Sequence, residues 1–111
     1  MTLTEKLIGT VAGGKKLVEL EITGPTSYTT GGFIERVSVG VKLDAFAVAL
    51  ADTPRANDLA YDANVTKEGE DGIKIALYSI NVTATTPVAW SEFAAAANVS
   101  GFKFRGIAVE I

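Results

Sequence analysis

The side chains of this chain that could do acid–base or metal chemistry are almost all carboxylates, because the sequence contains no histidine and no cysteine. Histidine is the commonest general base near neutral pH and a frequent metal ligand, and cysteine supplies thiolate nucleophiles. The serines therefore have no histidine partner for a hydrolytic triad. The composition argues against an enzyme, and we expect no cofactor and no catalytic or metal site.

Two sets of acidic residues remain as candidates. Six acids near the middle of the chain offer the oxygen atoms that a hard cation such as calcium prefers, but their spacing matches no known calcium-binding loop. We interpret them as a solvated surface. Four other glutamates are scattered, and their spacing does not predict a carboxyl pair. The first set is Asp52, Asp58, Asp62, Glu68, Glu70 and Asp71, and the second is Glu5, Glu35, Glu92 and Glu110.

Turn-forming residues and hydroxyls fill a ten-residue stretch, residues 24–33, between two apolar runs. Pro25 fixes its own φ, and the glycine pair near the end of the stretch can adopt positive φ. No helix with a lysine follows these glycines, which argues against a phosphate-binding loop. We predict an ordered loop, anchored by Tyr28, that serves either the fold or a partner. The residues of this candidate site are Pro25, Thr26, Ser27, Tyr28, Thr29, Thr30, Gly31, Gly32 and Phe33.

The first half of the chain reads as strands around this loop. Residues 6–12 and the alternating apolar residues of 18–22 predict a hairpin with a two-residue Gly-Gly turn. Residues 37–43 and 46–50 each alternate with period two but in opposite phase, which predicts two strands or one bulged strand, with the change at Asp44 and Ala45. A helix over residues 45–51 is the alternative, because alanine is the best helix former.

The second half continues in the same way. Residues 59–65 predict a short strand, residues 73–82 a central strand that is apolar on both faces, and residues 88–90 a short extended piece. Residues 92–97 predict one helical turn or a wide loop. The last strand, residues 102–111, changes its apolar phase at Gly106, which predicts a bulge there. The total of seven or eight short strands predicts an all-β fold: one antiparallel β-sandwich or small barrel domain over residues 1–111.

Composition limits the kinds of partner. The net charge of -3 argues against nucleic-acid binding. No apolar run reaches the roughly 20 residues that span a membrane, so we expect no membrane partner. The first residues lack a signal-peptide pattern, which favours synthesis and use in a cytoplasm. The mean hydropathy of +0.28 is high for a small monomer and favours a homo-oligomer or a permanent partner.

Two stretches, residues 24–33 (GPTSYTTGGF) and residues 90–105 (WSEFAAAANVSGFKFR), resemble loops of small head proteins of tailed bacteriophages. The resemblance is to capsid decoration, or cement, proteins, which carry GP-x-SY-x-x-GGF early and E-x-A-x-G-x-x-(S/T)-G late. It departs from that pattern where Ala96 or Ala97 stands in place of glycine. The resemblance implies a virion protein, assembled in the host cytoplasm, that binds the major capsid protein on the outer surface of the head. It implies a trimer by analogy.

An alternative function is a carbohydrate- or receptor-binding β-sandwich module of a head fibre or tail. Its candidate aromatic platform consists of Trp90, Tyr61 and Tyr78, joined by Tyr28. Aromatic rings on the surface of a β domain can stack on sugar rings, although in such domains they more often belong to a core or an interface.

Overall fold

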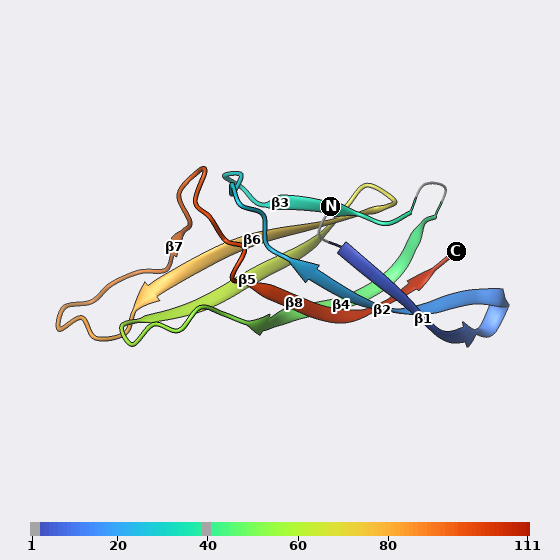
Figure 1. Ribbon diagram of the computed structural model, residues 1–111, viewed down its shortest axis with the longest axis horizontal. Helices are drawn as coiled ribbons and strands as arrows, with labels where there is room; N and C mark the ends of the chain where they lie inside the picture. The colour runs from blue at the N-terminus through green and yellow to red at the C-terminus, as the bar shows by residue number, and fades with distance from the viewer. Residues whose placement is uncertain (1–2, 39–40) are drawn as a thin grey trace.

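The computed structural model describes residues 3–38 and 41–111, and in it the chain forms two antiparallel β-sheets packed face to face (Figure 1). This confirms the predicted all-β sandwich. Sheet A has the strand order β1-β2-β8-β4, and sheet B has the order β3-β6-β5 with β7 beside β6. The strands are β1 Leu3–Val11, β2 Lys15–Thr23, β3 Phe33–Arg36, β4 Leu43–Asp52, β5 Leu59–Glu68, β6 Gly72–Asn81, β7 Ser91–Glu92 and β8 Lys103–Glu110.

The predicted first hairpin is present as β1 and β2, but its turn is longer than expected. Val11 pairs with Lys15, so the turn has three residues, Ala12–Gly14, and not two. Gly13 and Gly14 have φ of 82° and 73°, a region that residues with a Cβ seldom occupy. The glycine pair therefore marked the position of the turn correctly, but the turn also includes Ala12 and is one residue longer than predicted.

The prediction of a strand over residues 37–43 is wrong for the described residues of that range. β3 ends at Arg36 and β4 begins at Leu43, and the residues between them cross from sheet B to sheet A; Val39 and Gly40 lie outside the described residues. Val37 and Leu43 belong to the buried core, and their backbone N–H groups donate to the carbonyls of Asp71 and Glu70 in the β5–β6 turn. Alternating apolar residues here mark the two ends of a crossing connection.

The strand assignment for β4 is confirmed, and the helical alternative is excluded. Phe46, Val48 and Leu50 alternate with exposed alanines and pack against the core. The register with β8 shifts between Leu43 and Ala45, which is the irregularity that the phase change predicted. β5 and β6 also form, with β6 as the inner strand of sheet B between β3 and β5, as its apolar residues on both faces predicted.

The predicted bulge at Gly106 is absent. Gly106 pairs in continuous register with Leu20 on β2 and with Val48 on β4, and its φ is not positive. A Cβ at this position would overlap the carbonyl oxygen of Ala47, so glycine is required by the close approach of two backbones. The inward phase continues from Phe104 through Gly106 to Ala108. The apolar residues that alternate with these, from Ile107 onward, therefore lie on the outer face of sheet A.

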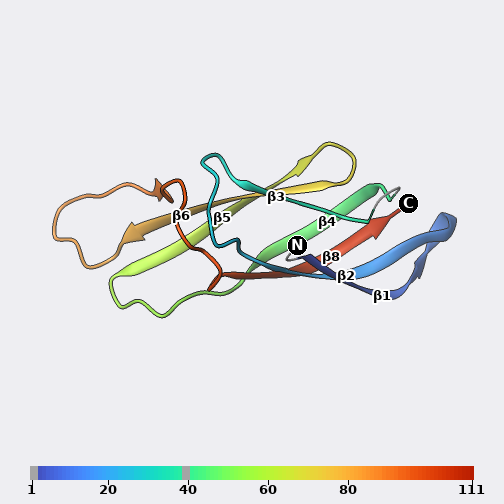
Figure 2. The same cartoon turned by 45° about the horizontal axis from the view of Figure 1, so that its top comes forward.

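The molecule is elongated, with principal extents of 54 × 22 × 20 Å. The core lies where the two sheets overlap, and it is formed by β2 and β8 of sheet A against β3 and β6 of sheet B. The turn between β1 and β2 lies at one end, while the β4–β5 and β6–β7 connections lie together at the other (Figures 1 and 2). Partner-binding surfaces can thus be separated by the length of the molecule.

Candidate functional site

The two stretches that carry the resemblance, residues 24–33 and residues 90–105, lie against each other and are joined by backbone hydrogen bonds. The N–H of Tyr28 donates to the carbonyl of Ala97 at 2.8 Å, and the N–H of Ala96 donates back to the carbonyl of Tyr28 at 2.7 Å. The N–H of Val99 donates to Pro25 at 3.0 Å, and that of Gly24 donates to Phe102 at 2.9 Å. We call this unit the loop junction. Sequence spacing gave no sign that the two stretches meet.

The Tyr28 side chain attaches the loop junction to sheet B through two hydrogen bonds. Its hydroxyl donates to Glu92 Oε2 at 2.7 Å and accepts the N–H of Leu77 at 3.0 Å. Glu92 Oε2 also accepts the N–H of Gly31 at 2.7 Å. Burial raises the pKa of Tyr28 to about 12, and the hydrogen bond to the Glu92 carboxylate adds to the rise. The hydroxyl therefore stays protonated at all ordinary pH values and acts as a fixed structural donor.

Aromatic rings fill the space behind this hydroxyl. The Tyr28 ring lies 6.3 Å from Phe33 and 6.2 Å from Phe93, centroid to centroid, in edge or tilted geometry. Such arrangements stabilise beyond simple burial. Within the candidate loop, Tyr28, Gly32 and Phe33 are thus buried and Pro25 is half-buried. The side of the loop that is open to solvent consists of Thr26, Ser27, Thr29, Thr30 and Gly31.

Ala96 is the only non-glycine residue with positive φ in the described part of the chain, at 66°. This backbone region costs an alanine on the order of 1–2 kcal/mol and costs glycine little. The loops that this stretch resembles often carry glycine at Ala96 or Ala97, and the structure shows that a glycine-type conformation is kept at Ala96.

The structure does not gather the three residues of the alternative aromatic platform. Tyr61 packs inside the sandwich, with its ring 4.9 Å from Phe102 and 6.0 Å from Phe93. Tyr78 lies on the opposite face of sheet B, because Tyr61 pairs with Ser79, the neighbour of Tyr78. Trp90 is 48% exposed in the connection that leads into β7.

Residues 82–90 form an exposed connection at one end of the molecule. Every residue in it is exposed and none is charged, and it includes Val82, Val88 and Trp90, which are 58%, 46% and 48% exposed. Its position beside the β4–β5 connection is visible in Figure 2. Exposed apolar side chains of this size are typical of surfaces that contact other proteins.

One carboxyl pair that the spacing did not predict is formed by Glu5 on β1 and Glu110 on β8. Glu110 is 4% exposed, and its Oε2 has no hydrogen-bond partner in the described structure. Burial raises the pKa of Glu110 to about 7, the hydrogen bond with Glu5 and the charge of Glu5 add to the rise, and Lys16 opposes it. A protonated Glu110 near neutral pH relieves the repulsion between two carboxylates.

The described residues contain no group of three metal-ligating side chains, so the six acids in the middle of the chain do not converge. Several of them instead make surface ion pairs, including Arg36 with Asp71 at 2.7 Å and Arg105 with Asp52 at 3.5 Å. Of the remaining glutamates, Glu35 is buried on β3. Within residues 3–38 and 41–111, no helix is long and apolar enough to cross a membrane.

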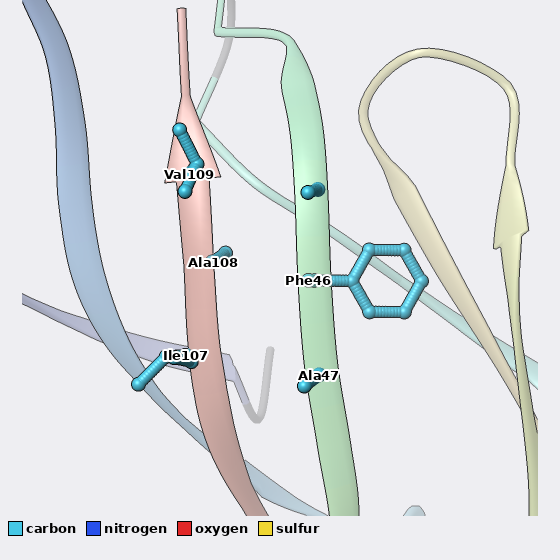
Figure 3. A pocket seen from close by; sticks show the side chains of 6 residues that line it. Phe46, Ala47, Ile107, Ala108 and Val109 are labelled. Carbon is cyan, nitrogen blue, oxygen red and sulfur yellow. The ribbon is translucent and has the colours of Figure 1, made fainter. Parts of the chain in front are cut away.

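A shallow apolar groove of roughly 220 Å³ runs along the outer face of sheet A between β8 and β4. Figure 3 shows Ile107 and Val109 on β8 and the small side chain of Ala47 on the neighbouring strand β4. The sequence did not reveal this groove, because the change of apolar phase at Gly106 was interpreted as a bulge and not as an apolar outer face. The alternating alanines of β4, Ala45, Ala47, Ala49 and Ala51, were the available signal.

Comparison with models of protein families, with curated proteins and with solved structures finds no match to this chain.

Proposed function

We propose that the protein is a virion structural protein that decorates the outside of a tailed-phage head. In this role it binds the major capsid protein, associates with copies of itself, and catalyses no reaction. It is made in the host cytoplasm and ends on the surface of the capsid.

The observation that supports this proposal most is the loop junction. The paired residues of the two stretches that resemble decoration-protein loops are 61 to 78 positions apart in the chain, from Gly31 with Glu92 to Gly24 with Phe102. They nevertheless form one hydrogen-bonded unit, and the glycine-type backbone at Ala96 suits the residue that these loops often carry. Two motifs that are parts of one structure are better support for a shared family than two independent matches.

Surface composition also supports a binding role. Ten large hydrophobic side chains are exposed among the described residues; eight lie on β1, at the C-terminal end of the chain on the outer side of β8, and in the β6–β7 connection, and the other two are Ile34 on β3 and Leu59 on β5. A small protein that exposes this much apolar surface gains stability from association, since association removes that surface from water. Trp90, Tyr61 and Tyr78 are dispersed, so no observation favours a sugar-binding platform.

The test is addition of the purified protein to capsids that lack it, built from the major capsid protein of the same phage. We expect the protein to co-sediment with these shells in a saturable manner. The Trp90→Ala and Val88→Ser variants serve to locate the contact within the β6–β7 connection. Failure of the parent protein to sediment with shells, under conditions where it is folded, would refute the proposal.

A further inference from the structure

The outer face of sheet A carries an apolar band that no part of the described chain covers. The strand neighbours of its members, such as Val18 and Ala108, point into the core, so the band faces outward. Ile111, Ile107 and Val11 are 63%, 48% and 38% exposed. We define the outer band as Val11, Leu17, Ala45, Ile107, Val109 and Ile111.

Strand register arranges the outer band in rows. One row crosses all four strands without a charge and contains Gly9, Leu17, Val109 and Ala45. On one side of this row, two residues away along the strands, Glu19 pairs with Ile107. The row on the other side, also two residues away along the strands, contains Lys15 and Ile111. These two residues are next to the paired residues Lys16 and Glu110.

We propose that the outer band is a self-complementary surface that binds a second copy of this chain, face to face, about a two-fold axis. The axis lies in the plane between the two copies, perpendicular to the strands and parallel to the row of Leu17 and Val109. Rotation about it exchanges the two flanking rows. Glu19 of one copy then faces Lys15 of the other, and Ile107 faces Ile111, each contact occurring twice.

The charges favour this arrangement. Lys15 makes an ion pair with Asp44 at 2.7 Å that remains partly open to solvent, whereas Glu19 lies opposite Lys6 on β1 but makes no ion pair in the described structure. Packed sheets lie about 10 Å apart, a gap that a lysine and a glutamate span together. Each Glu19 would join a Lys15–Asp44 pair of the opposite copy. A two-fold interface uses the same patch on both copies, whereas the trimer implied by the resemblance needs two different patches.

The size of the outer band predicts a weak dimer. Four strands are about 19 Å wide, and three rows of side chains occupy about 20 Å along them. This is at or below the low end of specific protein interfaces, so we expect a dissociation constant on the order of micromolar. The inference rests on the self-association part of the proposed function and is independent of shell binding.

The experiment is sedimentation velocity of the full chain from about 1 to about 100 µM at low salt, where charge pairs are little screened. We expect a monomer–dimer equilibrium. Ile107→Thr should weaken the dimer by about tenfold or more. The matched control is Ile34→Thr, an isoleucine of similar exposure, 42%, on β3 of the other sheet, and it should leave the equilibrium unchanged.

Charge reversal tests the register. Lys15→Glu and Glu19→Lys should each weaken the dimer, and the double variant should recover most of the loss, because the two charges then face each other with exchanged signs. Circular dichroism melts confirm that each variant is folded. A monomer at all concentrations, a trimer, equal effects of Ile107→Thr and Ile34→Thr, or a double variant as weak as the singles would each overturn the proposal. Shell binding measured on the same variants reports separately on the proposed function.

Discussion

The Tyr28 hydroxyl and the Glu92 carboxylate, 64 residues apart in sequence, lie 2.7 Å from each other at the point where two loops and sheet B meet. Glu92 comes from the two-residue strand β7, which pairs with β6 through Tyr78 and Ser79. The short strand fixes the carboxylate, the carboxylate orients the phenol, and the phenol holds the N–H of Leu77 at 3.0 Å. One side chain therefore ties the loop junction to a central strand.

The first prediction concerns this hydroxyl. Tyr28→Phe keeps the ring but leaves the Leu77 N–H without its acceptor and removes one of the two hydrogen bonds to Glu92 Oε2, so we expect a loss of about 1–3 kcal/mol in the free energy of unfolding. Urea denaturation measures it. Tyr78→Phe is the control, because the Tyr78 hydroxyl makes no hydrogen bond in the described structure, and it should change stability little. Equal stability of Tyr28→Phe and the parent would show that the hydroxyl does not anchor the loop.

The second prediction concerns the strained backbone at Ala96. Ala96→Gly removes the cost of φ at 66° but increases the freedom of the unfolded chain, so we expect a net stabilisation of about 0.5–1 kcal/mol. Ala95→Gly, at an exposed neighbour without positive φ, should be neutral or destabilising. Thermal melts of the two variants provide the comparison. A lower melting temperature for Ala96→Gly than for the parent would contradict the account of this loop.

The third prediction concerns Gly106. Gly106→Ala places a methyl group against the Ala47 carbonyl and the Val48 Cα, which are backbone atoms that cannot rotate away. We expect a loss of about 2 kcal/mol or more. The control is Gly9→Ala, since a Cβ at Gly9 meets nothing within 4 Å. If both variants unfold at the same denaturant concentration, the explanation of Gly106 by a close approach of β8 and β4 is wrong.

These positions show what the sequence could and could not predict. The strands of β2, β4, β6 and β8 were predictable, because period-two alternation depends only on neighbours along the chain. The role of Gly106 was not, because a missing Cβ can mean a bulge or a close approach, and only the partner strand decides. The loop junction and the Glu5–Glu110 pair depend on contacts between distant segments. Val37 and Leu43 were misleading, because burial at the two ends of a crossing connection resembles the alternation of a strand.

The fourth prediction is a pH dependence of stability. An unfolded glutamate titrates near 4.5, whereas Glu110 in the folded protein titrates near 7. Between these values the folded state holds a proton that the unfolded state has lost, so the contribution of Glu110 to stability is present below pH 4.5 and is lost as the pH rises to 7. The effect should be on the order of 3 kcal/mol, because each unit of pKa shift corresponds to about 1.4 kcal/mol.

Glu110→Gln isolates this contribution, because the amide cannot titrate and does not repel Glu5. Melting curves at pH 5, 6, 7 and 8 should show a smaller decline with rising pH for Glu110→Gln than for the parent. The informative quantity is the difference in stability between the two proteins at each pH, because the contribution of the surface carboxylates is the same in both and cancels. Parallel pH profiles would mean that Glu110 is not protonated in the folded state.

The central claim is that the protein coats a capsid, and its copy number in purified virions tests that claim most directly. Quantitative mass spectrometry of virions gives the ratio of this chain to the major capsid protein. A decoration protein should be present at a fixed ratio of the same order as the capsid subunits. Only a few copies of this chain per virion, as expected for a fibre or receptor-binding module, would contradict the claim. Absence of the chain from the virion would also contradict it.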